Sequence, residues 1–209
     1  ATVRKKVRFI HSSCVPISRD GGKKMGNKSN WTLVLEELRT DTIIKSKKGL
    51  HFIIASVFIW AAILVIHLLP LQILTKNMFT FCCSAPLVPL AYGISKLIGV
   101  DFQNRENPLT KLGILFALNQ MLYILIVMWV YAAEPEKMLM VYAMVFGAHL
   151  LPFGWLYRSK AYYVLSIVIP FGVLILGLYF VPAVIAGVML VTEVGFCCLL
   201  WREVKKAEP

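Results

Sequence analysis

Four polar side chains interrupt long apolar stretches of the sequence, and their types and positions could support chemistry. Glu193 is the only acid inside such a stretch, and His149 is the only histidine far from the end of one. Asn119 and Gln120 lie together in a third stretch. An ionisable group at the centre of a bilayer costs about 2.5 to 3.5 kcal/mol on insertion scales, so each one found there is a candidate for function.

These residues reach the same depth if each stretch is a membrane-crossing helix. With a rise of about 1.5 Å per residue, His149 and Glu193 would each lie about 16 to 18 Å from one membrane face. Asn119 would lie about 13 to 14 Å from the opposite face, which is the same level in a core of about 30 Å. We therefore predict a polar layer in which Glu193 and His149 share a proton and titrate as a pair.

Each of the four residues also has a purely structural interpretation. Asn and Gln in membrane helices commonly join helices by hydrogen bonds. A single histidine such as His149 is often a satisfied core residue, and Glu193 could hydrogen-bond as the neutral acid. Both interpretations stay open at the level of sequence.

Signatures of enzymes and metal sites are missing from the sequence. It contains no HExxH, GxSxG or P-loop motif. The five cysteines lack zinc-ligand spacing, because they occur as the lone Cys14 and two adjacent pairs inside apolar runs. We expect no catalytic residue, no metal and no cofactor.

The composition excludes a soluble protein and argues against nucleic-acid binding. Hydrophobic residues make up 58% of the chain and charged residues 16%, with a mean hydropathy of +0.72, whereas charged residues are about a quarter of a soluble domain. The formal net charge is +11, and residues 1–24, with seven basic side chains and one acidic side chain, contribute +6 of it. Most of the remaining charge lies in short segments between apolar runs, which is typical of membrane topology.

Six apolar segments are long enough to cross a bilayer, since a spanning helix needs about 20 apolar residues. We predict an all-α fold, a bundle of six transmembrane helices. Pro70 ends the first segment, and Asn107 and Pro108 supply an N-cap and a first-turn residue for the third. The predicted spans are residues 50–69, 78–98, 109–132, 138–157, 161–180 and 181–201.

Basic residues are concentrated on one side of these spans. Cytoplasmic connections of membrane proteins are rich in Lys and Arg, so the asymmetry predicts that both termini are cytoplasmic. The alternate connections contain only Lys76 and Lys137. The basic-rich side holds Lys45, Lys47, Lys48, Lys96, Arg105, Lys111, Arg158, Lys160, Arg202, Lys205 and Lys206.

The first 24 residues show neither an apolar run nor a periodic pattern. Reverse translation of Gly21 to Met25 resembles a ribosome-binding site followed by a start codon, which predicts a native chain beginning at Met25 and a disordered translated leader before it. The alternatives are a targeting or expression segment and a basic tail on anionic lipid. The remaining predicted parts are a cytoplasmic amphipathic helix and basic linker over 25–49, the membrane domain over 50–201 and a cytoplasmic tail over 202–209.

Four prolines near or inside the predicted spans are candidate hinges. Proline removes a backbone hydrogen bond and clashes with the preceding turn, so it kinks a helix. Carriers use such bends, although structural membrane helices contain them as well. The candidates are Pro86, Pro89, Pro152 and Pro170.

Three segments of the chain resemble a family of small bacterial multi-pass membrane proteins that is classed only as a domain of unknown function. The similarity covers about Lys45 to the end of the sixth span. It implies a bacterial inner-membrane protein and brings no activity, cofactor or site residue with it. The segments are DFQNRENPLTKLG at 101–113, LNQMLYILIVMW at 118–129 and PEKMLMVYAMVFGAHLLPFGWLYRSKAY at 135–162.

Three classes of function remain open for such a protein. A structural, sensory or partner-binding membrane protein needs only the six spans, whereas a small-solute or proton-coupled transporter would use the mid-membrane Glu193 and His149. An intramembrane enzyme is the least favoured class, because no nucleophile or metal set is recognisable. The expected partners are the lipid bilayer and a further copy or another membrane protein, and not nucleic acid.

Overall fold

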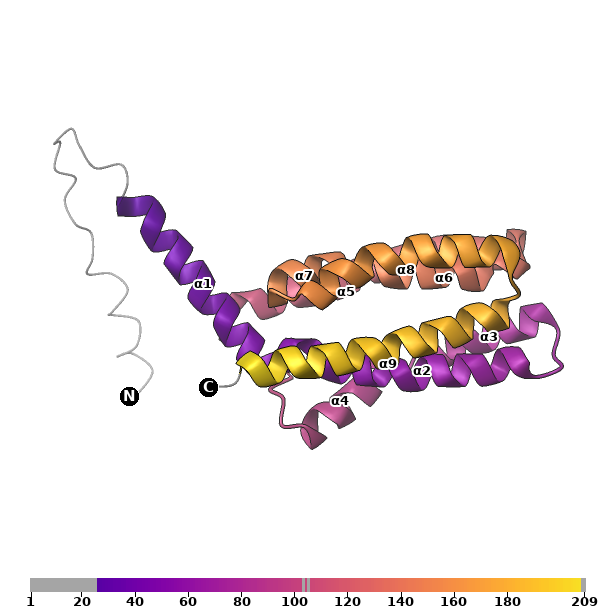
Figure 1. Cartoon of the computed structure of the whole chain (residues 1–209), viewed down its shortest axis with the longest axis horizontal. Coiled ribbons are helices and arrows are strands. Elements are labelled where there is room, and N and C mark those ends of the chain that lie inside the picture. The colour runs from indigo at the N-terminus through magenta and orange to yellow at the C-terminus, as the bar shows by residue number, and fades with distance from the viewer. Residues whose placement is uncertain (1–25, 103, 105, 208–209) are drawn as a thin grey trace, which may run out of the picture. The chain divides into compact units, whose positions relative to one another are not determined.

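The computed structural model describes residues 26–102, 104 and 106–207, and every regular element within them is a helix (Figure 1). The predicted all-α fold is therefore confirmed for this part of the chain. The predicted leader over 1–24 lies outside the described residues. The chain divides into two compact units, Ala1–Val34 and Leu35–Pro209, and the packing below concerns the second.

Three residues with left-handed backbone separate the first two helices. Helix α1 covers Gly26–Ser46 and includes the predicted amphipathic segment, and α2 covers Leu50–Leu68. Between them, the 3₁₀ turn Lys47–Gly49 has φ values of 46°, 54° and 72°. A Cβ at Gly49 would lie 3.2 Å from the ring of Tyr157 and 3.2 Å from the hydroxyl of Tyr162, so space and backbone both favour glycine there.

The second predicted span, 78–98, is broken and begins earlier than expected. Helix α3 covers Ile73–Ser84 and α4 covers Leu87–Leu97, with a bend of 41° between them. Pro86 stands at the break, where its missing N–H and its ring prevent a continuous helix.

Helix α5, Pro108–Ala133, matches the third predicted span closely. The Asn107 side chain accepts a hydrogen bond from the Leu109 amide at 2.9 Å, which is the predicted N-cap. Only 11% of the most apolar part of α5 is buried, so most of its large apolar side chains face outward. Such a surface suits contact with lipid.

The last three predicted spans appear as four helices. Helices α6, Met138–Ala148, and α7, Leu151–Tyr157, cover the fourth span; α8, Lys160–Tyr179, covers the fifth; and α9, Pro182–Ala207, covers the sixth. Pro182 occupies the first turn of α9, as predicted. By length and composition the described residues contain five helices that could cross a membrane, or six if α3 and α4 form one broken span.

Two helix pairs form the centre of the second unit. Helix α9 lies along α2, and α8 lies along α6 (Figure 1). Gly147 lets α6 approach α8 closely, because a Cβ there would lie 2.6 Å from Ile169. The large core side chains between the helices include Trp60, Ile63, Leu139, Leu156, Met189 and Phe196.

Candidate functional site

Glu193 is completely buried where α9 packs against α2. It is 0% exposed, and its Oε2 is joined by a hydrogen bond to the hydroxyl of Ser56, which is also buried. The other carboxyl oxygen, Oε1, finds no hydrogen-bond partner among the described residues. A buried polar atom without a partner is rare in proteins, so this carboxyl group is an unusual feature of the core.

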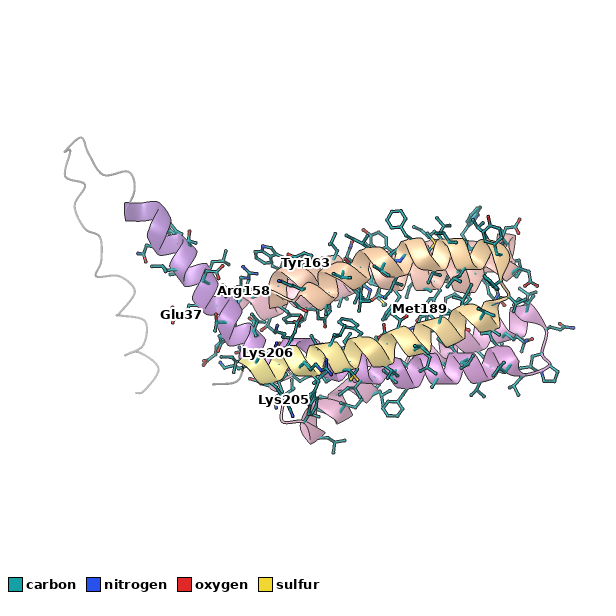
Figure 2. The ribbon with its side chains drawn as sticks, viewed as in Figure 1. Glu37, Arg158, Tyr163, Met189, Lys205 and Lys206 are labelled. Atoms are coloured by element: carbon teal, nitrogen blue, oxygen red, sulfur yellow. The ribbon has the colours of Figure 1, made fainter. Side chains whose placement is uncertain are left out.

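The surroundings of Glu193 are apolar along α9 in both directions. Met189, labelled on α9 in Figure 2, precedes it by about one turn. Phe196 follows it, and both side chains are buried. The ring of Tyr162 from α8 packs edge-on against Phe196 at a centroid distance of 4.8 Å. The carboxyl group therefore lies in a medium of low polarity, where an electrostatic change has a large energetic effect.

His149 takes a different partner from the one predicted. It lies half-buried at the interruption between α6 and α7, and its Nδ1 is hydrogen-bonded to the carbonyl of Phe146. Its ring packs against Phe146 and Phe153 at centroid distances of 5.3 and 5.9 Å. Among the described residues, no hydrogen bond or ion pair joins His149 to Glu193.

The two amides of the predicted polar layer face different environments on α5. Asn119 is exposed, whereas its neighbour Gln120 is buried. Adjacent residues on a helix point about 100° apart, so one helix cannot turn both toward the same site. Neither amide hydrogen-bonds Glu193 or His149 within the described part of the chain.

The four candidate hinges fall into two groups. Pro86 and Pro152 lie where a predicted span is interrupted, next to the α3–α4 and α6–α7 breaks. Pro89 and Pro170 lie inside the continuous helices α4 and α8. Only the first two prolines thus coincide with a change of helix.

An open cavity of about 410 Å³ lies at the end of the bundle that contains His67, here called the His67 end. The His67 Nε2 and the Thr80 Oγ1 are 3.2 Å apart, and Lys76 donates to the His67 carbonyl at 3.1 Å. The cavity is lined by His67, Leu71, Ile73, Lys76, Glu136, Val181, Pro182 and Ala183.

Asn77 anchors the wall of this end. It is 0% exposed, and its Nδ2 donates to the carbonyl of Pro135 at 2.8 Å, while its Oδ1 has no partner among the described residues. Asn77 lies just before the predicted second span, 78–98, so it was not among the predicted site residues. Asn77 and Thr80 recur at helical spacing, which is the signal that would have found them.

The opposite end, here called the Lys48 end, holds a network of charged residues. Lys48 is only 7% exposed, and its Nζ lies 2.8 Å from Glu203 Oε2. The Glu203 Oε1 accepts from the Ala161 amide in the first turn of α8 at 3.3 Å, and Tyr162 donates its hydroxyl to the Lys48 carbonyl at 2.9 Å. The network thus ties the Lys47–Gly49 turn, which precedes α2, to α8 and α9.

A second charged group at the Lys48 end joins α1 to the start of α5. Asp41 forms an ion pair with Lys45 at 2.8 Å, and its Oδ2 accepts from Asn104 and Asn107 at 2.7 and 2.9 Å. These bonds stabilise the carboxylate form. The hydrogen bond from Lys45, followed by that from Asn107, lowers the pKa of Asp41 below its ordinary value.

Comparisons with known proteins identify one family. Residues 35–203 match the model of a family of unknown function, DUF7010. No significant match is found among curated proteins or among solved structures. The predicted resemblance to an uncharacterised family is therefore confirmed, and the match carries no activity, ligand or site residue with it.

Within the described residues, no group of three or more His, Cys, Asp and Glu side chains is arranged to hold a metal ion.

Proposed function

The chain belongs to DUF7010, a family of unknown function, and on that premise we propose that it is a proton-responsive membrane protein of the sensory or partner-binding class. The protonation site is Glu193, and the element that responds is the contact between α2 and α9. One observation supports this role above the others: the buried Ser56 hydroxyl lies between the Glu193 carboxyl group and a backbone carbonyl.

The proposed topology has six spans with both termini in the cytoplasm of a bacterial cell, in its inner membrane. The α3–α4 pair counts as one broken span, which gives the even number that the basic residues favour. The outward-facing apolar surface of α5 would contact lipid or a second copy of the chain.

Hydrogen-bond counting favours the neutral acid at Glu193. Ser56 has one hydroxyl proton, and its Oγ lies 2.8 Å from the Ile53 carbonyl as well as in contact with Glu193. If Ser56 donates to Ile53, the carboxyl group must donate to Ser56, and it then carries a proton. An ionised Glu193 would instead accept a hydrogen bond from the Ser56 hydroxyl and leave Oε1 as an unpaired charged atom in the core, which is strongly unfavourable.

Loss of the proton would consequently weaken the contact between the two helices. The bare carboxylate would draw water or a cation into the α2–α9 contact, or push the helices apart. Among the described residues, Tyr162 of α8 and Cys197 of α9 are titratable groups within electrostatic range of Glu193, and neither supplies a positive charge. The pH of the surroundings would thus set the separation of α2 and α9.

The test uses the full chain in lipid nanodiscs with spin labels on α2 and α9. We expect the distance distribution to broaden as pH rises in the wild type and to be independent of pH in Glu193→Gln, because glutamine mimics the neutral acid. Glu134→Gln, a change at an exposed loop acid, serves as the matched control and should keep the wild-type response. An identical response in wild type and Glu193→Gln would rule out the proposed protonation site.

A proton-coupled carrier is the second candidate, and the broken α3–α4 span favours it. Discontinuous spanning helices form the substrate sites of many carriers, and the bend at Pro86 is 41°. In proteoliposomes, a carrier would couple solute uptake to a pH gradient, and Glu193→Gln would abolish the coupling. A protein of the sensory class would show the distance change without any flux.

A further inference from the structure

We propose that the cavity at the His67 end binds a small zwitterion, a molecule with both a primary ammonium group and an anionic oxygen group. The cavity is distinct from the protonation site, because Glu193 lies about 16 Å along α9 from the cavity residue Pro182. It brings together one cationic and one anionic side chain, Lys76 and Glu136, which form no ion pair with each other.

The size and walls of the cavity suit a small organic molecule. Its volume of about 410 Å³ falls within the usual range of small-molecule sites, about 300 to 1,000 Å³. The apolar part of the wall comes from the start of α3, with Leu71 just before it, and from the start of α9. These apolar residues are Leu71, Ile73, Val181, Pro182 and Ala183.

Lys76 retains donors for an anionic group. Its ammonium carries three N–H donors, and the His67 carbonyl uses one of them at 3.1 Å. That bond also fixes the ammonium over the cavity, because His67 is itself held by Thr80. The site therefore presents a positioned positive charge and not a freely moving surface lysine.

Glu136 supplies the complementary acceptor. It is exposed, and the described residues contribute no ion pair to it. The short 3₁₀ helix that carries it, Pro135–Lys137, is fixed on both sides: buried Asn77 donates to Pro135, and Lys137 donates to the Gly177 carbonyl at 2.6 Å. The neighbouring lysine is thus occupied at the end of α8 and does not neutralise Glu136.

These two charges select for a molecule that carries both signs. A simple anion would satisfy Lys76 and leave Glu136 unpaired, and a simple cation would do the reverse. An ammonium donating to Glu136 and an anionic oxygen accepting from Lys76 would form two charge-assisted hydrogen bonds. An apolar amino acid and the phosphoethanolamine headgroup of a membrane lipid share this chemistry, with an apolar portion for the remaining wall.

The test measures binding of leucine to the full chain in nanodiscs of phosphatidylcholine only, by isothermal titration calorimetry. We expect the affinity for leucine to fall about tenfold or more in Lys76→Gln and in Glu136→Gln. Lys76→Arg, which keeps the positive charge, should retain most of the wild-type affinity. Leucine methyl ester, which lacks the anion, should bind the wild type more weakly than leucine does, but should bind Lys76→Gln about as well as leucine does. N-acetyl-leucine, which lacks the ammonium, should bind the wild type more weakly than leucine does, but should bind Glu136→Gln about as well as leucine does.

Lys111→Gln and Glu106→Gln are matched controls, because these charges lie beside the start of α5 and away from the cavity. A second arm adds phosphatidylethanolamine to the nanodiscs and measures lipid retained on the protein by native mass spectrometry. Retention that the two cavity variants lose, without leucine binding, would support the site with a lipid as its ligand. The proposal would be overturned if the wild type bound neither leucine nor the lipid. It would also be overturned if both cavity variants remained folded and bound the ligand as tightly as the wild type does.

Discussion

The two ends of the helix bundle use their charged residues in opposite ways. At the Lys48 end, the ammonium of Lys48 and the carboxylate of Glu203 are paired at 2.8 Å, and Asp41 is paired with Lys45. At the His67 end, Lys76 donates only to a neutral carbonyl, and Glu136 has no ion pair among the described residues. Paired charges hold helices in place, whereas unpaired charges beside a cavity are available to a ligand.

The two ends also differ in how strongly their helices are connected. At the Lys48 end, one network joins the left-handed turn before α2 to α8 and α9, and the Lys48 carbonyl of this turn accepts a hydrogen bond from Tyr162. The contacts described at the His67 end are single hydrogen bonds and not ion pairs, such as the bond between His67 and Thr80. We therefore expect the Lys48 end to contribute more to stability and the His67 end to contribute more to recognition.

The largest expected effect concerns the side of the membrane on which each end lies. One reporter fusion follows Pro209 in the chain, beyond the end of α9 that carries Glu203, and the other lies within the 134–137 connection at the His67 end. The two should report opposite sides with all-or-none signals. Activity of the same reporter at both positions would show that the two ends are not separated by the bilayer, and the six-span topology would then be wrong.

The next effect is the loss of the ion pair at the Lys48 end. Lys48→Met keeps the aliphatic stem but leaves the Glu203 carboxylate without its partner, and should lower the free energy of unfolding by about 3 kcal/mol, the lower end of the range for breaking a buried pair. The measurement is denaturation by SDS in mixed micelles. The exposed Lys206→Met is the control, and the double variant Lys48→Met with Glu203→Met should recover most of the loss.

A smaller effect is expected for the corresponding contact at the His67 end. Thr80→Val keeps the shape of the side chain and removes the hydroxyl that pairs with His67, so unfolding should be easier by about 1 kcal/mol, the usual value for one neutral hydrogen bond. The same SDS titration measures it. A loss equal to that of Lys48→Met would contradict the difference between the two ends.

The smallest effect is the pH dependence contributed by Asp41. Its pKa in the folded protein is lowered from the ordinary value of 3.8 by the hydrogen bond from Lys45 and then by that from Asn107. The carboxylate therefore stabilises the fold above about pH 4 and loses this contribution as pH falls through the lowered value. Thermal unfolding between about pH 3 and 6 should show a shallower acid slope in Asp41→Asn than in the wild type.

The helices of this protein could largely be predicted from local sequence. Apolar runs of about 20 residues have few alternatives to a spanning helix, because unpaired backbone groups are unfavourable in lipid. The expected third span, 109–132, appears as Pro108–Ala133 with the expected Asn107 cap. The cause of the break, Pro86, is visible in the sequence, but periodicity does not tell whether a membrane helix bends at a proline or stops there.

The polar partners were decided by tertiary structure alone. Equal depth along two helices does not determine which way each side chain points. The sequence therefore paired Glu193 with His149, whereas in the structure Glu193 bonds the hydroxyl of Ser56 and His149 bonds a carbonyl of the preceding helix, α6. The cavity at the His67 end likewise depends on residues from 67 to 183 that meet only when the bundle forms. The sequence by itself determined the apolar helices and their polar residues, because both are local features. The packing of one helix on another decided which polar groups became partners.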